Sequence, residues 1–560
     1  MSDPAAISYI RIHDEETTAG YLRSGIWTDQ PLQERIAHFA ETTPGQPAIS
    51  DGTRSWTYSE LNDHILRLAR TLLDLGVGRG EVVVVQSTNT THVPALHAAL
   101  AWIGAVMAPV SSQWREAEML PLLSTTRAVL LIHPADRTYD YVAAATTYVD
   151  RVDSLRQALT LDAIDDLASQ ARPLDPDEIR HRTSTANDPQ FAMSSSGSTG
   201  TPKISLQSYN DVYTQGVSTV GHSYGLSSSD TTLAIAPANL GSTGYVYPIL
   251  AALSVGAHAN LLPRWSAEAA LSQLSNLAVT VAVAVPTQMI MMLSQPVEEY
   301  NLESLRIFIG AGAPLPPNVA AEFEQRFGCR IFTLYGATDG GIAAFTDIDT
   351  PEMQRFNTVG RAPRGHDLRI LADDGEFAPA GTRGEIVWRG PSKSFGYLNQ
   401  SEMDAQAWRN GYFHSGDLGV IDDDGYLSVV GRLKEMILRG GHNIFPVEVE
   451  RLLVEHPAIA SVAVVGVPDD RLGERACAVI TVSAGHAEPS LGELQEFLAE
   501  RNLAKYKFPE FLVALEELPS NAGAKLNRPL IGDLARAALN ENKISSASIE
   551  NKGKPQHANS

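Results

Sequence analysis

Cysteine is scarce in this chain of 560 residues, which contains only Cys329 and Cys477. The two lie far apart, lack metal-ligand spacing and sit among apolar residues, so we expect both to be buried and structural. His222, His258 and His442 are also separated from one another and lack the spacing of metal ligands. We therefore expect no metal site beyond magnesium that arrives with a bound nucleotide.

Positive charge is also in short supply, with 43 Lys and Arg against 65 Asp and Glu and a formal net charge of −22. An acidic surface repels nucleic acid and anionic membranes, so neither is expected as the main partner. Any anionic substrate must therefore be bound by cations that the fold places locally.

Long apolar runs are missing as well. The stretch VPALHAALAWIGAVMAPV, which begins at Val93, is broken by His, Gly and Pro and does not form a convincing membrane span. The first residues, MSDPAAISYIRIHDEE, have neither the basic start nor the apolar core of a signal peptide. We expect a cytoplasmic protein without membrane insertion, either a monomer or a homodimer.

Helices and buried strands alternate along the chain. Thr57 and Glu60 form a capping box ahead of apolar residues at helical spacing, and Gly76 ends that helix. The run EVVVVQ at 81–86 predicts a strand buried on both faces, as in a parallel sheet. Further apolar runs, separated by helical segments, predict strands at 231–236, 278–285 and 305–309. This pattern predicts an α/β fold with crossover connections, and the length suggests roughly three or four domains or subdomains.

Other segments differ in composition. The polar, acidic stretch 160–186 is expected to run over the surface. After Glu385, short strands and turns rich in Gly and Asp precede a smaller module of helices and strands at 446–499. Residues 539–560 have little to bury and are expected to be disordered.

The stretch SSSGSTGTPKI, from Ser194 to Ile204, has the chemistry of a phosphate-binding loop. Gly197 and Gly200 let the backbone approach a ligand, backbone N–H groups and hydroxyls can donate to phosphate oxygens, and Lys203 adds a positive charge. It differs from a Walker loop, in which the lysine follows a glycine and opens a helix. A flexible Ser/Gly linker is the alternative interpretation of these residues alone.

Several sparse polar motifs follow this loop in a fixed order. They are IFIGAGAPLPP at 307–317, TLYGATDGG at 333–341, GYFHSGDLGVIDDDGY at 411–426, GRLKEMILRGGHNIFPVEVE at 431–450 and LPSNAGAKLNR at 518–528. In this order they resemble the adenylate-forming superfamily of acyl-CoA and aryl-CoA synthetases, adenylation domains and beetle luciferase, and most of all aryl- or cyclic-acid–CoA ligases. The resemblance extends from about residue 30 to residue 534.

The resemblance implies a fold and a domain division. A large N-terminal domain, residues 1–431, would contain crossover-linked sheets flanked by helices and a distorted β-barrel subdomain. A small, mobile α+β C-terminal domain would span residues 432–538, and 539–560 would form the disordered tail. Lys434 would be the hinge about which the small domain rotates between two half-reactions.

The resemblance also implies a reaction. A carboxylate attacks the α-phosphorus of magnesium-bound ATP, pyrophosphate leaves, and the acyl-adenylate forms a thioester with CoA. Lys525 would contact both the carboxylate and the α-phosphate, Thr338 the α-phosphate, and Lys203 the outer phosphates, which places positive charge and donors where charge develops. Asp339 would hold the magnesium.

Tyr335 would stack on adenine, Asp417 and Arg432 would bind the ribose, and Gly440 and Gly441 would face a pantetheine tunnel. The nucleotide- and CoA-binding positions that the resemblance implies are Ser195, Ser196, Gly197, Ser198, Thr199, Gly200, Thr201, Gly312, Ala313, Pro314, Tyr335, Gly336, Asp417, Arg432, Gly440 and Gly441.

Four positions depart from the family pattern. Ile204 replaces the usual glycine after Pro-Lys, and Asp339 replaces a glutamate that is one methylene longer. Gly523-Ala524 replaces the usual Thr-Gly before Lys525. The segment PANLGSTG at 237–244 lacks the aromatic residue and histidine of many acyl-CoA synthetases. These changes leave the ATP chemistry in place and bear on the acid and the second half-reaction.

The expected acid pocket is small, uncharged and rich in glycine. An aryl or cyclic acid fits best, because glycine-lined walls admit a flat ring. Transfer to a carrier protein or an amine, including nitrite activation for diazotisation of an arylamine, and a non-catalytic nucleotide-binding protein are the alternatives. The residues expected to line the pocket are Asn239, Gly241, Ser242, Thr243, Gly310 and Gly340.

Overall fold

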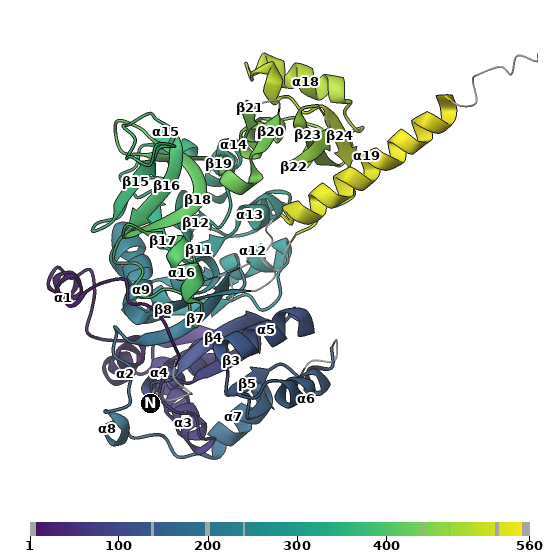
Figure 1. The fold of residues 1–560 in the computed structure, drawn as a ribbon. Coiled ribbons are helices and arrows are strands. Elements are labelled where there is room, and N and C mark those ends of the chain that lie inside the picture. The colour runs from purple at the N-terminus through teal and green to yellow at the C-terminus, as the bar shows by residue number, and fades with distance from the viewer. Residues whose placement is uncertain are drawn as a thin grey trace, which may run out of the picture.

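The computed structural model describes residues 7–135, 139–195, 202–238, 241–439, 442–469, 471–520 and 526–550. Within these residues the chain forms a large α/β body and a small C-terminal unit (Figure 1). None of the helices described is long and apolar enough to cross a membrane.

Two sheets with mainly parallel strands form the centre of the large body. One sheet has the order β6-β5-β3-β4-β7-β8, and the other has the order β14-β13-β12-β11-β9-β10-β1-β2. The strands of the first are β3 (Val82–Ser87), β4 (Val106–Ser111), β5 (Leu130–His133), β6 (Gln157–Thr160), β7 (Pro189–Ser195) and β8 (Lys203–Ser208). Those of the second are β1 (Pro47–Ser50), β2 (Ser55–Thr57), β9 (Thr231–Ala234), β10 (His258–Leu261), β11 (Val281–Ala284), β12 (Ile307–Ala311), β13 (Arg330–Ala337) and β14 (Gly341–Phe345).

Helices cover both sheets and fill the space between them. They are α1 (Glu15–Arg23), α2 (Leu32–Thr42), α3 (Tyr58–Asp74), α4 (His92–Trp102), α5 (Glu116–Thr126), α6 (Tyr141–Arg151), α7 (Leu161–Gln170), α8 (Pro176–Ile179), α9 (Tyr209–Tyr213), α10 (His222–Tyr224), α11 (Ala251–Val255), α12 (Ala267–Asn276), α13 (Pro286–Leu293), α14 (Pro317–Phe327), α15 (Glu352–Asn357) and the 3-10 turn η3 (Val297–Glu299). Two segments are π-helices, η1 (Thr214–Gly221) and η2 (Ser242–Leu250).

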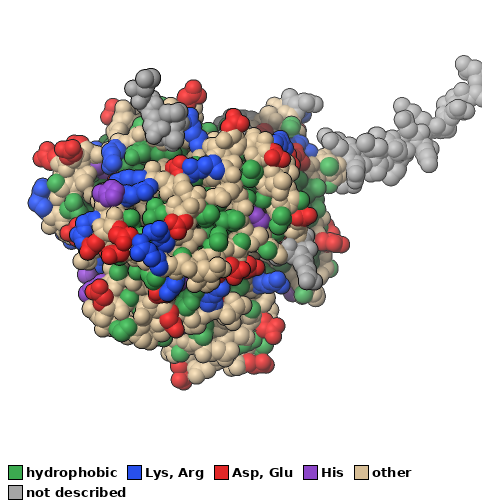
Figure 2. Space-filling model, turned by 90° about the horizontal axis from the view of Figure 1, so that it is seen from below, with side chains coloured by type: hydrophobic (Ala, Val, Ile, Leu, Met, Phe, Trp, Pro, Cys, Tyr) green, Lys and Arg blue, Asp and Glu red, His purple; other side chains and the backbone are tan. Residues whose placement is uncertain are grey.

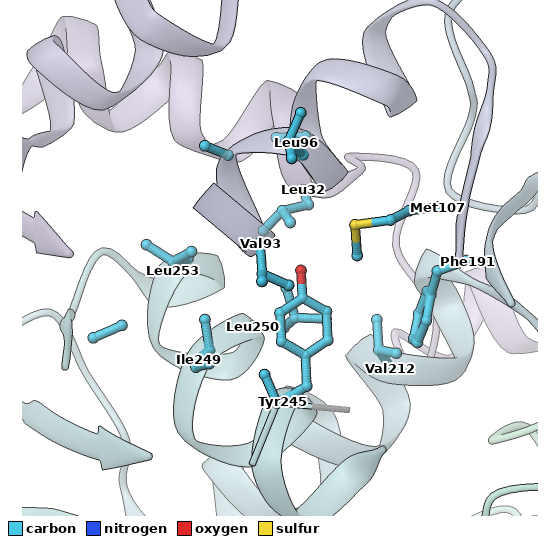
Figure 3. Packing of buried hydrophobic residues seen from close by; sticks show 14 of the residues in the cluster. Leu32, Val93, Leu96, Met107, Phe191, Val212, Tyr245, Ile249, Leu250 and Leu253 are labelled. Carbon is cyan, nitrogen blue, oxygen red and sulfur yellow. The ribbon is translucent and has the colours of Figure 1, made fainter. Parts of the chain in front are cut away.

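The core between the sheets is built from side chains of distant segments. Figure 3 shows Leu32, Val93, Met107, Phe191 and Leu250 converging around the ring of Tyr245. Burying such apolar surface is the main favourable contribution to folding. This core packs α4, η2 and the strands β4 and β7 against one another.

An antiparallel half-barrel follows, with the order β15-β16-β18-β17 and β19 paired to β18. Its elements are β15 (Asp367–Leu371), β16 (Gly384–Arg389), α16 (Ser401–Ala407), β17 (Trp408–Arg409), β18 (Tyr412–Ile421) and β19 (Leu427–Arg432). This curled sheet is the distorted barrel that the resemblance implies, so the predicted α/β fold class is confirmed in both parts of the large domain.

The small C-terminal unit begins after the 3-10 turn η4 (Leu433–Glu435). Its sheet has the order β21-β20-β23-β22, with β24 paired to β23. The elements are β20 (Ile437–Arg439), β21 (His442–Ile444), α17 (Pro446–Leu453), β22 (Ile459–Asp469), β23 (Gly473–Val482), α18 (Leu491–Glu500), η5 (Lys505–Lys507), β24 (Phe511–Ala514) and α19 (Arg528–Glu550). Arg451 Nη2 donates to Asn357 Oδ1 at 2.8 Å and is one contact between this unit and the large body.

Predictions that depend on residues close together in the sequence are confirmed. The side chain of Thr57 accepts from the backbone N–H of Glu60, completing the capping box of α3, and Gly76 follows the helix with φ of 81°. All residues of β3 are buried and paired in parallel. Cys329 and Cys477 are free and buried, as expected.

One expectation was wrong. The stretch 160–186 contains α7, whose Leu161, Ile164 and Ala168 are buried in the core, because these three share one helix face despite the acidic composition. The disordered tail at 539–560 stays a prediction; the helix α19 reaches Glu550, and no Gly or Pro interrupts the chain between Asp533 and Gly553. In Figure 1 this helix, in yellow, extends away from the body.

The negative net charge is distributed rather than concentrated on the face seen in Figure 2. Lys and Arg side chains lie among Asp and Glu over that face, with tan surface between many of the charged groups.

Candidate active site

The first cluster lies where β13 meets the half-barrel. Tyr335 is near the end of β13, while Asp417 in β18 is paired in register with Arg432 in β19. The Tyr335 hydroxyl donates to Asp417 Oδ2 at 2.7 Å, and Arg432 Nε forms an ion pair with Asp417 Oδ1 at 2.8 Å. Asp417 is buried, and its Oδ1, held by Arg432, keeps a further lone pair as an acceptor. Burial raises the pKa of Tyr335 well above its usual value, so the phenol stays a donor.

The ends of β12 and β13 bring further predicted positions to the same edge. Ala311 pairs with Leu334 in parallel register, so Gly312, Ala313 and Pro314 leave the sheet beside Tyr335 and Gly336. Gly312 has φ of 89°, a conformation that glycine adopts without strain. The four small positions are therefore adjacent to the Tyr335–Asp417 pair.

Thr338 and Asp339 occupy the turn between β13 and β14. The carbonyl oxygen of Thr338 accepts from Ser205 Oγ at 2.9 Å and from Gln207 Nε2 at 3.1 Å, both on β8. A Cβ built on Gly241 would lie 3.4 Å from Thr338 Oγ1, so this hydroxyl faces the start of η2. The turn thus joins the two central sheets at the site.

Asp339 lies beside two further site groups. Tyr397 donates its hydroxyl to Asp339 Oδ2 at 2.8 Å, and Lys203 Nζ lies 4.0 Å from the same oxygen. Asp339 Oδ1 is buried and has no hydrogen-bond partner among the residues that the structure describes. A buried carboxylate oxygen without a donor is a suitable ligand for a hard cation such as magnesium.

The two π-helices form the next wall. The Ser242 hydroxyl donates to Gln215 Oε1 at 2.7 Å, which joins η2 to η1. Gly244 is needed here, because a Cβ on it would lie 1.8 Å from the carbonyl oxygen of Pro237. Thr243 is buried. π-helical turns are rare and are frequent at functional sites.

The remaining predicted pocket positions lie on β12 and in the turn between β13 and β14. Gly310, in β12, would place a Cβ 3.2 Å from Met289 Sδ. Gly340 packs against the half-barrel, because a Cβ there would lie 2.4 Å from the Phe413 ring, and its carbonyl accepts from Trp388 Nε1 at 2.8 Å. These contacts explain both glycines by close packing.

Other predicted positions are only partly described. Ser195 ends β7, and exposed Lys434 lies in η4 between the half-barrel and the C-terminal sheet. Outside the described residues lie Ser196, Gly197, Ser198, Thr199, Gly200, Thr201, Asn239, Gly440, Gly441 and Lys525.

The structure adds polar residues that no motif indicated. Gln215, Ser205, Gln207, Tyr397 and Lys393 contact predicted site residues or lie one hydrogen bond away from them. They are far from their partners in sequence, so no local spacing could have pointed to them. The available signal was Ser205, a polar residue between Ile204 and Leu206, whereas Lys393 stands between Ser392 and Ser394 and gave none.

Comparison with known protein families shows which family this chain belongs to. The model of the AMP-binding enzyme family matches residues 36–398, and that of the AMP-binding enzyme C-terminal domain matches residues 448–525. This chain belongs to the AMP-binding enzyme family. It is an AMP-forming enzyme of the acid–CoA ligase group, which confirms the resemblance drawn from the motifs.

Similar proteins span nearly the whole chain. A medium-chain fatty-acid–CoA ligase of Escherichia coli is 30% identical over 531 residues, covering 92% of this chain and 93% of its own length. An indoleacetate–CoA ligase of Aromatoleum aromaticum is 33% identical over 524 residues, covering 89% and 96%. The structure of a benzoate CoA ligase from Burkholderia xenovorans superposes with a TM-score of 0.78 at 25% identity, covering 90% and 99%.

Proposed function

We propose that this enzyme activates a small aryl or cyclic carboxylic acid as its acyl-adenylate and then forms a thioester with CoA. The observation that carries the proposal is a pair of buried carboxylates that can each accept further, Asp417 beside Tyr335 and Asp339 next to Thr338. One suits the hydroxyls of a ribose, and the other suits the cation that accompanies a triphosphate.

The residues present fit ATP. Asp417 Oδ1, paired with Arg432, keeps a lone pair that can accept from a ribose hydroxyl, and the Tyr335 ring lies at the same edge for the base. Lys203 brings positive charge toward Asp339 and the turn of Thr338. In an acidic protein these local cations are what an anionic substrate requires.

The residues also fit magnesium. Asp339 Oδ1 lacks a donor, while Tyr397 holds Oδ2 and so fixes the carboxylate. Bound there, the ion would neutralise charge on the phosphate oxygens during transfer. Aspartate is shorter than glutamate, so a water could complete the contact.

The acid pocket is the less determined part. The wall of Gly241, Ser242, Thr243 and Gln215 carries hydroxyls and an amide, and Gly310 packs closely against the Met289 thioether. An aryl acid could use these hydroxyls and the amide to bind a polar ring substituent. The indoleacetate and benzoate ligases support this class, and the fatty-acid ligase supports a linear acid as the main competitor.

The second half-reaction would use the small domain. The thiolate of CoA attacks the acyl carbon, the bond to the AMP oxygen breaks, and AMP leaves with that oxygen. Lys434 lies between the two units, where a rotation would withdraw Lys525 and present Gly440 and Gly441. We assign these three residues and the hinge on the family resemblance.

The test is pyrophosphate release with ATP and magnesium across benzoates, cinnamates, cyclic acids, medium-chain fatty acids and nitrite, with and without CoA. Release that depends on an aryl or cyclic acid, is lost in Lys525→Ala, and gives a thioester mass with CoA is the expected result. Activity with fatty acids alone would overturn the aryl assignment. Release without a CoA adduct would favour a carrier-protein thiol or an amine as acceptor.

A further inference from the structure

Lys393 is a buried cation beside the candidate site that no motif includes. It is 1% exposed and lies on the segment between β16 and α16. Its Nζ donates to Ser205 Oγ at 2.6 Å and to the carbonyl oxygen of Leu206 at 2.7 Å. A lysine is seldom buried this completely unless it is paired, so its presence requires a physical reason.

The direction of the hydrogen bonds is fixed by chemistry. An ammonium can only donate, so Ser205 must accept from Lys393 and use its single proton elsewhere. That proton goes to the carbonyl oxygen of Thr338 at 2.9 Å. Lys393, Ser205 and Thr338 therefore form one chain of hydrogen bonds, in which the charge at one end strengthens the bond at the other.

The segment that carries Lys393 is held from both sides. The backbone N–H of Ile12 donates to the carbonyl oxygen of Ser394 at 2.9 Å on the N-terminal side. On the side of β8, the N–H groups of Leu206 and Leu398 donate to the carbonyl oxygens of Gly396 and Ile204. Tyr397, on the same segment, contacts Asp339. The segment thus places two side chains, Lys393 and Tyr397, next to the groups of the Thr338–Asp339 turn or one hydrogen bond away from them.

Carboxylates surround the ammonium. Asp211 is fully buried and accepts from Ser394 Oγ at 2.5 Å, and Asp404 accepts from the backbone N–H of Tyr397 at 2.7 Å. Burial lowers the pKa of Lys393 to about 8, while attraction to Asp211, Asp339 and Asp404 opposes that shift. At neutral pH the side chain is therefore still largely charged.

We propose that Lys393 is a positioning residue: acting through Ser205, it orients the Thr338–Asp339 turn and so sets the affinity for magnesium-bound ATP. The inference rests on the proposed nucleotide site and assigns to it a residue that touches neither nucleotide nor metal. Without the ammonium, Ser205 could turn away and Thr338 would keep only the bond from Gln207.

The test measures the Kd of ATP with magnesium by calorimetry at pH 7, without acid substrate. We expect Lys393→Met, which keeps a side chain of similar length and removes the charge, to raise the Kd about tenfold. Ser205→Ala should raise it in the same direction. If Lys393 acts through Ser205, the double variant binds no more weakly than Lys393→Met alone.

Arg355→Met is the matched control. Arg355 is also a buried cation, 3% exposed, and pairs with Glu324 and the carbonyl of Ile331 at the other end of β13. Its loss should lower the melting temperature without changing the Kd. Equal Kd values for wild type, Lys393→Met and Ser205→Ala would overturn the proposal, as would additive effects in the double variant.

Two further outcomes are also decisive. If Lys393→Met does not fold, Ser205→Ala decides alone, because it keeps the charge of Lys393 and removes only the hydroxyl that links Lys393 to Thr338. If the wild-type chain does not bind magnesium-bound ATP, the proposed function fails, and the inference fails with it.

Discussion

Replacement of Asp417 by asparagine should remove the ability of the protein to recognise a ribose. Asp417 is 8% exposed; Tyr335 donates to one of its oxygens, and Arg432 is paired with the other, which keeps a lone pair for a ribose hydroxyl. Asparagine keeps the shape and still offers Tyr335 an acceptor, but it loses the charge. A hydrogen bond to a charged group contributes about 1.5–3 kcal/mol, which corresponds to about a ten- to hundredfold change in Kd.

The assay compares ATP with its 2′-deoxy and 3′-deoxy analogues by calorimetry. Wild type should bind at least one analogue about ten- to hundredfold more weakly than ATP, and Asp417→Asn should bind all three within about twofold of one another. Asp230→Asn is the control, since Asp230 is also buried and paired with an arginine, Arg306, but lies outside the site. Full discrimination retained in Asp417→Asn would refute the role of Asp417.

Three further predictions follow from contacts elsewhere. Burial lowers the pKa of His97 to about 3 and that of His366 to about 4, so both imidazoles stay neutral in the folded protein. Their contribution to the free energy of unfolding is full above the unfolded pKa of about 6.5. It falls by about 2 kcal/mol per histidine between pH 6.5 and 5, because only the unfolded chain takes up the proton. Urea midpoints across this range should show the loss, and His97→Gln, which can still bond to Tyr245, should reduce it. Gly244→Ala should destabilise the protein by about 1–3 kcal/mol because its Cβ would meet the carbonyl of Pro237, whereas Gly45→Ala, which meets nothing within 4 Å, should change stability by less than about 1 kcal/mol. Lys434→Pro should restrict the hinge and lower thioester formation more than pyrophosphate release; equal loss of both would contradict the hinge assignment.

The elements that sequence predicted well are those with local causes. The capping box at Thr57 needs only two residues three positions apart, and the run of valines in β3 is apolar on both faces wherever it packs. The helix α7 was missed because its acidic face dominates the composition, while the burial of Leu161, Ile164 and Ala168 depends on contact with the core.

The candidate site likewise contains residues that the sequence predicted and residues that it could not. The order of the motifs pointed to Tyr335, Thr338, Asp339, Asp417 and Arg432, and the structure brings these residues together. Lys393 and Gln215 could not be predicted, since each acquires its role from a partner far away in sequence, Ser205 and Ser242. A buried charge or amide is recognisable only when the fold that buries it is known.

The path of one oxygen atom tests the central claim most directly. The acid that gives the highest rate, labelled with oxygen-18 in both carboxylate oxygens, is converted with ATP, magnesium and CoA, and the products are weighed by mass spectrometry. Attack of the carboxylate on the α-phosphorus predicts AMP that carries one labelled oxygen, together with unlabelled pyrophosphate. Unlabelled AMP, or ADP with labelled phosphate, would contradict an acyl-adenylate intermediate.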